Sequence, residues 1–225
     1  MTDGIESPAL HRVAQAYSSP HWWYDIRGFF ILHLSYQDHL TRLLNFFAEN
    51  GSQKHLEIAV GSGSFLELVI LWRRFIKRRP RMEGVAVDYA PSMLEGAVSR
   101  FGRLPGWDVQ LADAADLPFS DGQFETANMA NALHSMPDPR GAIAELFRVL
   151  RPGGRAALNV VLVSRGGPFR RWVADRVADW GMRKGILVRP YTESEVRGMM
   201  LAQGFTIERT SIYGNDFCLL VRKPL

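Results

Sequence analysis

Residues 55–65 read HLEIAVGSGSF, and this stretch decides the fold class. Its first part, residues 55–60, is a short and mostly apolar run that suits a buried strand better than a helix. Gly61 and Gly63 then permit a tight turn, and helical periodicity begins at Phe65. A strand that passes through a glycine-rich turn into a helix is typical of the first unit of an α/β sheet.

The same alternation of strand and helix repeats along the chain. Further strands are predicted over 84–88, 107–111, 124–130 and 155–163, with helices over 91–101 and 139–150. Two last strands, 205–213 and 216–222, flank Gly214-Asn215 and read as a hairpin. We therefore predict an α/β fold with a Rossmann-like, seven-stranded sheet. Its strands are mostly parallel, the C-terminal hairpin adds an antiparallel strand, and helices cover both faces.

Two segments stand outside this alternation. Residues 8–49 show apolar positions at helical spacing, and Asn50-Gly51 supplies the stop. Residues 164–191 separate the fifth strand from a helix that opens at Thr192 with the spacing of a capping box. We predict a helical cap at residues 1–50 and a core at residues 51–225, with 164–191 as a helical lid inserted in the core.

The composition excludes several classes of protein. The formal net charge is only +4, which does not by itself indicate nucleic-acid binding. Cys218 is the single cysteine, so an intramolecular disulfide and a cysteine-based zinc site are excluded, and the scattered histidines predict no metal site. The longest apolar runs, 29–34 and 66–72, are too short to cross a bilayer. The N-terminal residues are polar, so we expect a cytoplasmic protein.

Acidic residues follow two of the predicted strands. Asp88 ends the second strand, where a carboxylate can accept two hydrogen bonds from a ribose diol, or can cap the helix that starts at Pro91. Asp113 follows the third strand and can accept from an exocyclic amine, although alone it reads as a loop residue. A dinucleotide turn needs a third glycine where Leu66 stands, and no Walker lysine is present. A different nucleoside-bearing cofactor is therefore indicated.

Ordered blocks over residues 54–160 resemble class I S-adenosylmethionine-dependent methyltransferases of the quinone and small-molecule type. The blocks are LEIAVGSG (56–63), VDYAPSML (87–94), DAADLPF (113–119), FE (124–125), LHSMPD (133–138) and LRPGGR (150–155). Two positions depart from the family pattern. Ala59 stands where glycine is usual, which narrows the space behind the loop, and Glu125 replaces the common aspartate.

The resemblance implies S-adenosyl-L-methionine as the cofactor and assigns residues to it. Glu57 would orient the amino group of the methionine part, and Gly61 and Gly63 would pass close to that part. Asp88 would take the ribose hydroxyls, and Asp113 the adenine amine. The full set of cofactor-binding residues implied is Glu57, Ala59, Gly61, Gly63, Asp88, Tyr89, Met93, Asp113, Ala114, Asn128 and Met129.

Candidates for catalysis and acceptor binding are fewer. His134 follows the fourth strand and is the first candidate for a general base, with a packing or capping histidine as the alternative. Tyr24, or Tyr17, is a second candidate because N-terminal segments of similar enzymes fold over the cofactor. Aromatic and basic side chains of the cap and lid could line the acceptor pocket or simply form a helical core; the candidates are Trp22, Trp23, Arg27 and Trp172.

The leading hypothesis is methyl transfer to a small, partly hydrophobic acceptor that is quinone-like, lipid-like or a natural product, at O, N or C. One alternative is a methyltransferase-like binding protein without catalysis; another is a nucleic-acid methyltransferase. Against the last, the fourth strand ends in Asn128-Met129-Ala130-Asn131, which lacks the signature of exocyclic amine methylation. We predict no nucleic-acid partner. The basic segment 73–81 is a candidate for peripheral contact with anionic lipid, or a solvated helix end.

Overall fold

The computed structural model describes residues 31–225, apart from the side chain of Leu32. The predictions for Tyr17, Trp22, Trp23, Tyr24 and Arg27 lie outside the described residues, as does most of the predicted cap.

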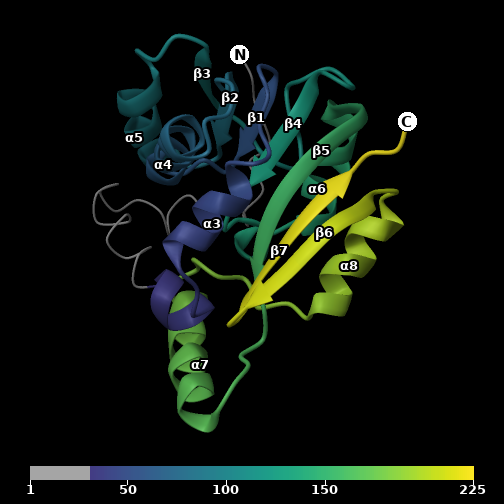
Figure 1. Ribbon diagram of the computed structural model, residues 1–225. Helices are drawn as coiled ribbons and strands as arrows, with labels where there is room; N and C mark the ends of the chain where they lie inside the picture. The colour runs from purple at the N-terminus through teal and green to yellow at the C-terminus, as the bar shows by residue number, and fades with distance from the viewer. Residues whose placement is uncertain (1–30) are drawn as a thin grey trace, which may run out of the picture.

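The described chain alternates strands and helices as expected (Figure 1). In chain order its elements are η1 (Leu32–Tyr36), α3 (Leu40–Phe47), β1 (His55–Ile58), α4 (Ser64–Leu71), η2 (Trp72–Ile76), β2 (Gly84–Asp88), α5 (Pro91–Phe101), β3 (Trp107–Leu111), β4 (Phe124–Met129), η3 (Leu133–Ser135), α6 (Pro139–Val149), β5 (Leu150–Val161), α7 (Pro168–Arg183), α8 (Glu193–Ala202), β6 (Thr206–Tyr213) and β7 (Asp216–Arg222).

The seven strands form one sheet with the order β3-β2-β1-β4-β5-β7-β6. β1 pairs in parallel with both β2 and β4, so the strand order reverses between β1 and β4. β7 pairs antiparallel with both β5 and β6, so it is the one strand of this sheet that runs against the direction of the others. The predicted fold class is confirmed. In such a sheet the carboxyl ends of the strands at the point of reversal form a crevice, which is where ligands bind.

Helices cover both faces of the sheet and bury two separate apolar layers. Side chains of α6 and α8 pack with β1, β4 and β5 on one face, whereas those of α3, α4 and α5 pack on the other. In Figure 1 these two groups of helices lie on opposite sides of the sheet, and α7 extends below it, beyond the end of β5. All four residues of β1 are buried, including the polar His55 and Glu57, as expected for a central strand that is covered on both faces.

Several predicted bounds are wrong for identifiable reasons. The helix expected over 8–49 is interrupted at residues 37–39, because Gln37 adopts a left-handed conformation with φ of 55°. β1 ends at Ile58 and not at Val60, because Ala59 also has a positive φ, of 57°. β5 starts at Leu150, earlier than Arg155, since the chain pairs with β4 already at Phe124.

Candidate active site

A cavity of about 410 Å³ opens at the carboxyl ends of β1 to β4. It lies where the strand order reverses, as expected for this type of sheet. Of the eleven residues predicted to bind the cofactor, eight line it: Glu57, Ala59, Gly61, Asp88, Tyr89, Met93, Asp113 and Ala114. Gly63, Asn128 and Met129 are not among its lining residues. The roles of all eleven stay predictions.

The turn after β1 brings main-chain groups to the cavity. Ala59 and Gly61 have φ of 57° and 58°, and both face the cavity. The Gly61 N–H donates to Oδ2 of Asp88 at 2.7 Å, which ties the turn to the end of β2. Gly63 is buried behind the turn, with φ of 82°, and a Cβ there would lie 2.6 Å from Cε2 of Phe101. Close packing against α5 and the left-handed backbone conformation each require a glycine at this position.

Asp88 is half-buried at the cavity wall. Its Oδ1 accepts from the Ala90 N–H at 2.8 Å, and its Oδ2 accepts from Gly61. Burial raises the pKa of Asp88, and the main-chain hydrogen bonds from Ala90, Gly61 and Tyr89 act against that rise. The two carboxylate oxygens offer about four lone-pair sites together, so three main-chain donors do not fill them and the group can still accept a hydrogen bond from a ligand hydroxyl.

The two ends of the cavity carry different polar groups. At the end near β3, the Asp113 carboxylate accepts from the Ala115 N–H at 2.9 Å and lines the cavity. At the end near β4, Glu57 is buried, and its Oε2 lies 3.2 Å from Nε2 of His55. Nδ1 of His55 lies 2.8 Å from the Thr126 hydroxyl. A carboxylate buried this deeply is a fitting partner for an ammonium group.

Asn128 pairs with Glu57 in the register of β1 and β4, but it stands behind the cavity wall. Its Oδ1 accepts from Nδ2 of Asn50 at 3.0 Å, and Asn128 is buried. Among the described residues, its Nδ2 has no hydrogen-bond partner. Met129 is also fully buried, within the apolar layer that α6 and α8 cover.

His134 is not among the cavity-lining residues. Its Nε2 lies 2.7 Å from the hydroxyl of Tyr36, and both residues are buried. Burial lowers the pKa of His134 to about 3, so its imidazole is neutral near pH 7. The arrangement pairs His134 with Tyr36 of η1, outside the lining of the cavity.

The remaining predicted residues are distributed as follows. Trp172 on α7 is 56% exposed, stacks on Phe169 and lies under the guanidinium of Arg176; it does not line the cavity. Within the basic segment 73–81, Arg73 is buried and donates to the carbonyls of Ala48, Gly51 and Pro80. That side chain is structural and is not available to a partner.

The surface and the polar clusters give two further findings for residues 31–225. No group of three or more His, Cys, Asp or Glu in this part of the chain could hold a metal ion. No helix there is both long enough and apolar enough to cross a membrane.

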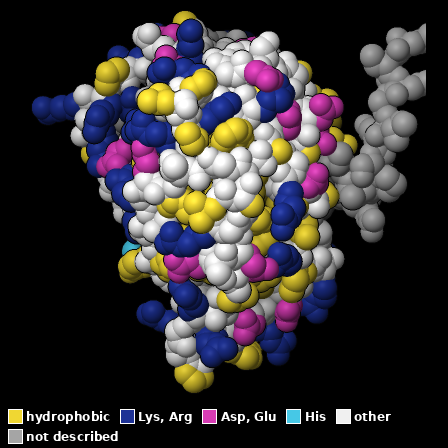
Figure 2. All heavy atoms as spheres, turned by 90° about the vertical axis from the view of Figure 1, so that its right-hand side faces the viewer, with side chains coloured by type: hydrophobic (Ala, Val, Ile, Leu, Met, Phe, Trp, Pro, Cys, Tyr) yellow, Lys and Arg dark blue, Asp and Glu magenta, His cyan; other side chains and the backbone are white. Residues whose placement is uncertain are grey.

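Over most of the face shown in Figure 2, Lys and Arg side chains are interspersed with acidic and uncharged ones.

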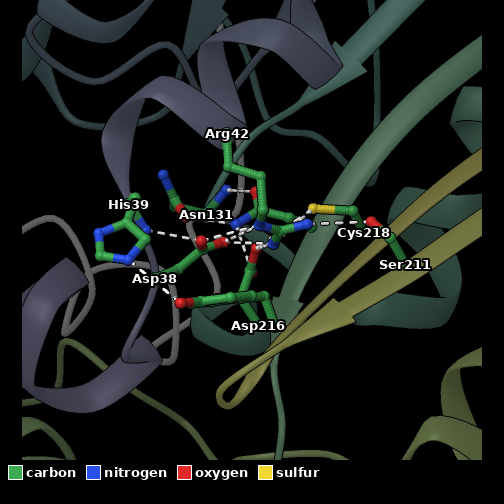
Figure 3. A network of polar contacts seen from close by, with 9 residues as sticks. Asp38, His39, Arg42, Asn131, Ser211, Asp216 and Cys218 are labelled. Carbon is green, nitrogen blue, oxygen red and sulfur yellow. Dashed lines mark hydrogen bonds and ion pairs between the residues drawn. The ribbon is translucent and has the colours of Figure 1, made fainter.

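A polar network beside the cavity was not predicted. Arg42 on α3 binds the buried carboxylates of Asp38 and Asp216, and Asn159 connects Asp216 to Asn131 at the cavity wall (Figure 3). The only local signal was the position of Asn131 just after a predicted strand. The other members come from distant segments, with the bonded pair Arg42 and Asp216 standing 174 residues apart, so no spacing along the chain indicates them.

Known proteins are similar to this chain over the segment that builds most of the cavity. Residues 56–158 match a family profile described as "Methyltransferase domain". The ubiquinone/menaquinone biosynthesis C-methyltransferase UbiE of Desulfotalea psychrophila is 35% identical over 105 residues, 47% of this chain and 40% of that protein. A demethylmenaquinone methyltransferase of Thermus thermophilus is 35% identical over 133 residues, 52% of this chain and 57% of that protein. The chain thus spans about half the length of these curated relatives.

Solved structures share the fold over more of the chain. A SAM-dependent methyltransferase from Aquifex aeolicus superposes with a TM-score of 0.60 at 20% identity, covering 85% of this chain and 92% of that one. The [4+2]-cyclase SpnF superposes with a TM-score of 0.64, also at 20% identity, covering 82% and 80%. Since one of these neighbours is a cyclase, the fold alone does not establish the reaction.

Proposed function

Residues 56–158 form a methyltransferase domain of the class I, S-adenosylmethionine-dependent type, and from this premise we propose that the chain transfers a methyl group to a small, partly hydrophobic acceptor. The resemblance inferred from the blocks over residues 54–160 is confirmed. The observation that carries the proposal is the arrangement of Glu57, Asp88 and Asp113 around one cavity at the switch in strand order.

The cavity fits the cofactor in its polar groups as well as in its position. Asp88 retains acceptor capacity for a ribose diol beside the Gly61 turn, and Asp113 and Ala114 stand next to it for an adenine. Tyr89 and Met93 supply apolar contact, and Glu57 offers a carboxylate at the opposite end. When bound, the cofactor supplies an activated methyl group on a sulfonium. The protein then has to hold both reactants in line and exclude water.

The proposal does not include a general base from the protein. His134 pairs with Tyr36 away from the cavity, so its role as a base stays a prediction without geometric support. Tyr24 and the acceptor-binding residues Trp22, Trp23 and Arg27 stay predictions on residues that the structure does not describe. Acceptors that ionise in water at neutral pH need no base from the protein.

The proposal extends to the class of acceptor, to a lid and to a surface that contacts lipid. The curated relatives methylate quinone precursors according to their names, which favours a quinone-like acceptor over a nucleic acid. Residues 164–191 are proposed as a lid, with α7 as its helix. Contact with anionic lipid near 73–81 is supported by the exposed side chains of Phe75 and Ile76, while a cytoplasmic location stays a prediction.

The experiment that tests the proposal is titration calorimetry with S-adenosylhomocysteine. Asp88→Ala removes the acceptors expected for two ribose hydroxyls, each bond to a charged group being worth about 1.5–3 kcal/mol, so Kd should rise by roughly 100-fold or more. Asp116→Ala is the matched control, because Asp116 is exposed near the same sheet edge and does not line the cavity. Wild-type protein without measurable affinity, or Asp88→Ala with wild-type affinity, would refute the proposal.

A further inference from the structure

Asn131 occupies an unusual place at the end of β4. It lines the cavity, it is half-buried, and its φ of 54° lies in the left-handed region, which asparagine tolerates better than most residues. Asp88 and Asp113 stand at the ends of β2 and β3, so Asn131 lies on the opposite side of the central strand β1 from them. The proposed function puts the ribose at Asp88 and the adenine at Asp113, so the methyl group is expected on this other side, toward β4.

The hydrogen bonds around Asn131 determine how two carboxamides are oriented. The main-chain N–H of Asn131 can only donate, and it donates to Asn159 at 2.8 Å, so the atom facing it must be Oδ1 of Asn159. Nδ2 of Asn159 therefore points the other way, toward Oδ1 of Asn131 at 2.7 Å and Oδ1 of Asp216 at 2.8 Å. Since Oδ1 of Asn131 is the atom that accepts, its Nδ2 is turned away from Asn159.

The network behind Asn159 makes this orientation rigid. Asp216 is completely buried on β7, and Nη2 of Arg42 donates to its Oδ2 at 2.7 Å. Nε of the same guanidinium contacts both carboxylate oxygens of Asp38, at 2.7 and 2.8 Å. Figure 3 shows these side chains converging on the guanidinium from α3, β7 and the loop that precedes α3. Burial, together with the nearby Asp38, raises the pKa of Asp216, which reduces the negative charge behind Asn131.

One pair of donors remains unused in this arrangement. Within residues 31–225, nothing accepts a hydrogen bond from Nδ2 of Asn131, although the residue is part of the cavity wall. We propose that this amide group donates to an ionised hydroxyl oxygen of the methyl acceptor, which makes Asn131 a specificity-determining residue for phenol-like or enol-like acceptors. The inference rests on the proposed function, because it places the acceptor beside a bound cofactor.

The physical consequence concerns the protonation state of the acceptor. A donor fixed at the cavity wall stabilises the anion more than the neutral hydroxyl, so it lowers the pKa of a bound phenol. A larger share of the bound acceptor is then in the nucleophilic, ionised form at neutral pH, and its proton leaves to solvent. A site built in this way does not need His134 at the cavity, which agrees with the position of that imidazole beside Tyr36.

The test uses 4-nitrophenol as the probe, because its phenolate has a visible absorption band. Wild-type protein saturated with S-adenosylhomocysteine should bind the phenolate and lower the apparent pKa of the probe. Asn131→Asp keeps the acceptor oxygen for Asn159 and the tolerance for a positive φ, but it replaces the amide donors with a carboxylate. We expect it to weaken phenolate binding by about 30-fold or more and to abolish the pKa shift of the probe. The affinity for S-adenosylhomocysteine should stay within about threefold of wild type.

Two further variants keep the result interpretable. Asn131→Gly removes the carboxamide without backbone strain and should also lose the spectral shift. Ser211→Ala is the matched control, because it removes a 3.0 Å contact with Arg42 at the far end of the network and leaves Asn131 in place; it should behave as wild type.

Three outcomes would overturn the inference. The first is an equal loss of S-adenosylhomocysteine affinity in Asn131→Asp, which would assign the amide to the cofactor. The second is wild-type protein that binds S-adenosylhomocysteine but not the phenolate. The third is an unchanged spectral shift in both Asn131 variants. Failure of the wild-type protein to bind S-adenosylhomocysteine at all would instead refute the proposed function, so the two failures are distinguishable.

Discussion

Gly63→Ala is the substitution whose cost the structure defines most fully. The residue has a φ of 82°, and a left-handed conformation costs a residue with a Cβ about 1–2 kcal/mol. The added Cβ would lie 2.6 Å from Cε2 of Phe101 and 3.2 Å from Cα of Ala97. Phe101 is buried, so relief requires α5 to move, and overpacking of this kind costs about 1–3 kcal/mol. Alanine also lowers the conformational entropy of the unfolded chain, which offsets about 0.4–1 kcal/mol of this destabilisation.

The expected net loss is therefore about 1–4.5 kcal/mol in the free energy of unfolding. Urea denaturation followed by circular dichroism measures it as a lower midpoint at an unchanged slope. Gly166→Ala separates the two causes, because Gly166 has a φ of 94° but its added Cβ would meet nothing closer than 3.8 Å. It should cost about 1 kcal/mol or less. Combining Gly63→Ala with Phe101→Leu should give a smaller loss than the sum of the single losses. Equal losses for the Gly63 and Gly166 variants would refute the assignment of Gly63 to helix packing.

Two further predictions concern residues that the sequence singled out. Ala59→Gly should stabilise the protein by up to about 1 kcal/mol, because relief of the left-handed strain at φ 57° exceeds the entropy lost by glycine; a lower urea midpoint would contradict this. His134 is protonated in the unfolded chain below its ordinary pKa of 6.5 but stays neutral in the folded protein down to about 3. The unfolding free energy should thus fall by up to about 1.4 kcal/mol per pH unit between these limits as pH decreases. His134→Gln should make that decline shallower in urea titrations at several pH values, and an unaltered slope would show that His134 is not the cause.

Much of the fold could be predicted because its signals are local. Buried parallel strands read as short apolar runs, and the helices between them show their own periodicity, as at 55–60 and 91–101. The wrong bounds all occur where a non-glycine residue takes a positive φ or where pairing with a distant strand extends an element. Tertiary contacts override local preference at such positions.

The position of the cavity at the strand ends could be predicted from the sequence. Strand ends of a parallel sheet meet at one edge, so polar residues placed after successive strands must converge there; Asp88 and Asp113 do so. Glu57 lies within β1 and also lines the cavity, but only the family resemblance indicated it. This is a consequence of topology, and topology was readable from the order of strands and helices.

Only the tertiary structure decided which of the remaining residues reach the cavity. His134 follows β4 in the chain, yet its ring turns to Tyr36, which is 98 residues away. Asn131 faces the cavity because Asn159, Asp216 and Arg42 hold it there. A side chain follows its hydrogen-bond partners, and partners contributed by distant segments leave no periodic or spacing signal. The sequence thus determined where the cavity lies, whereas long-range polar contacts decided how Asn131 and His134 are oriented beside it.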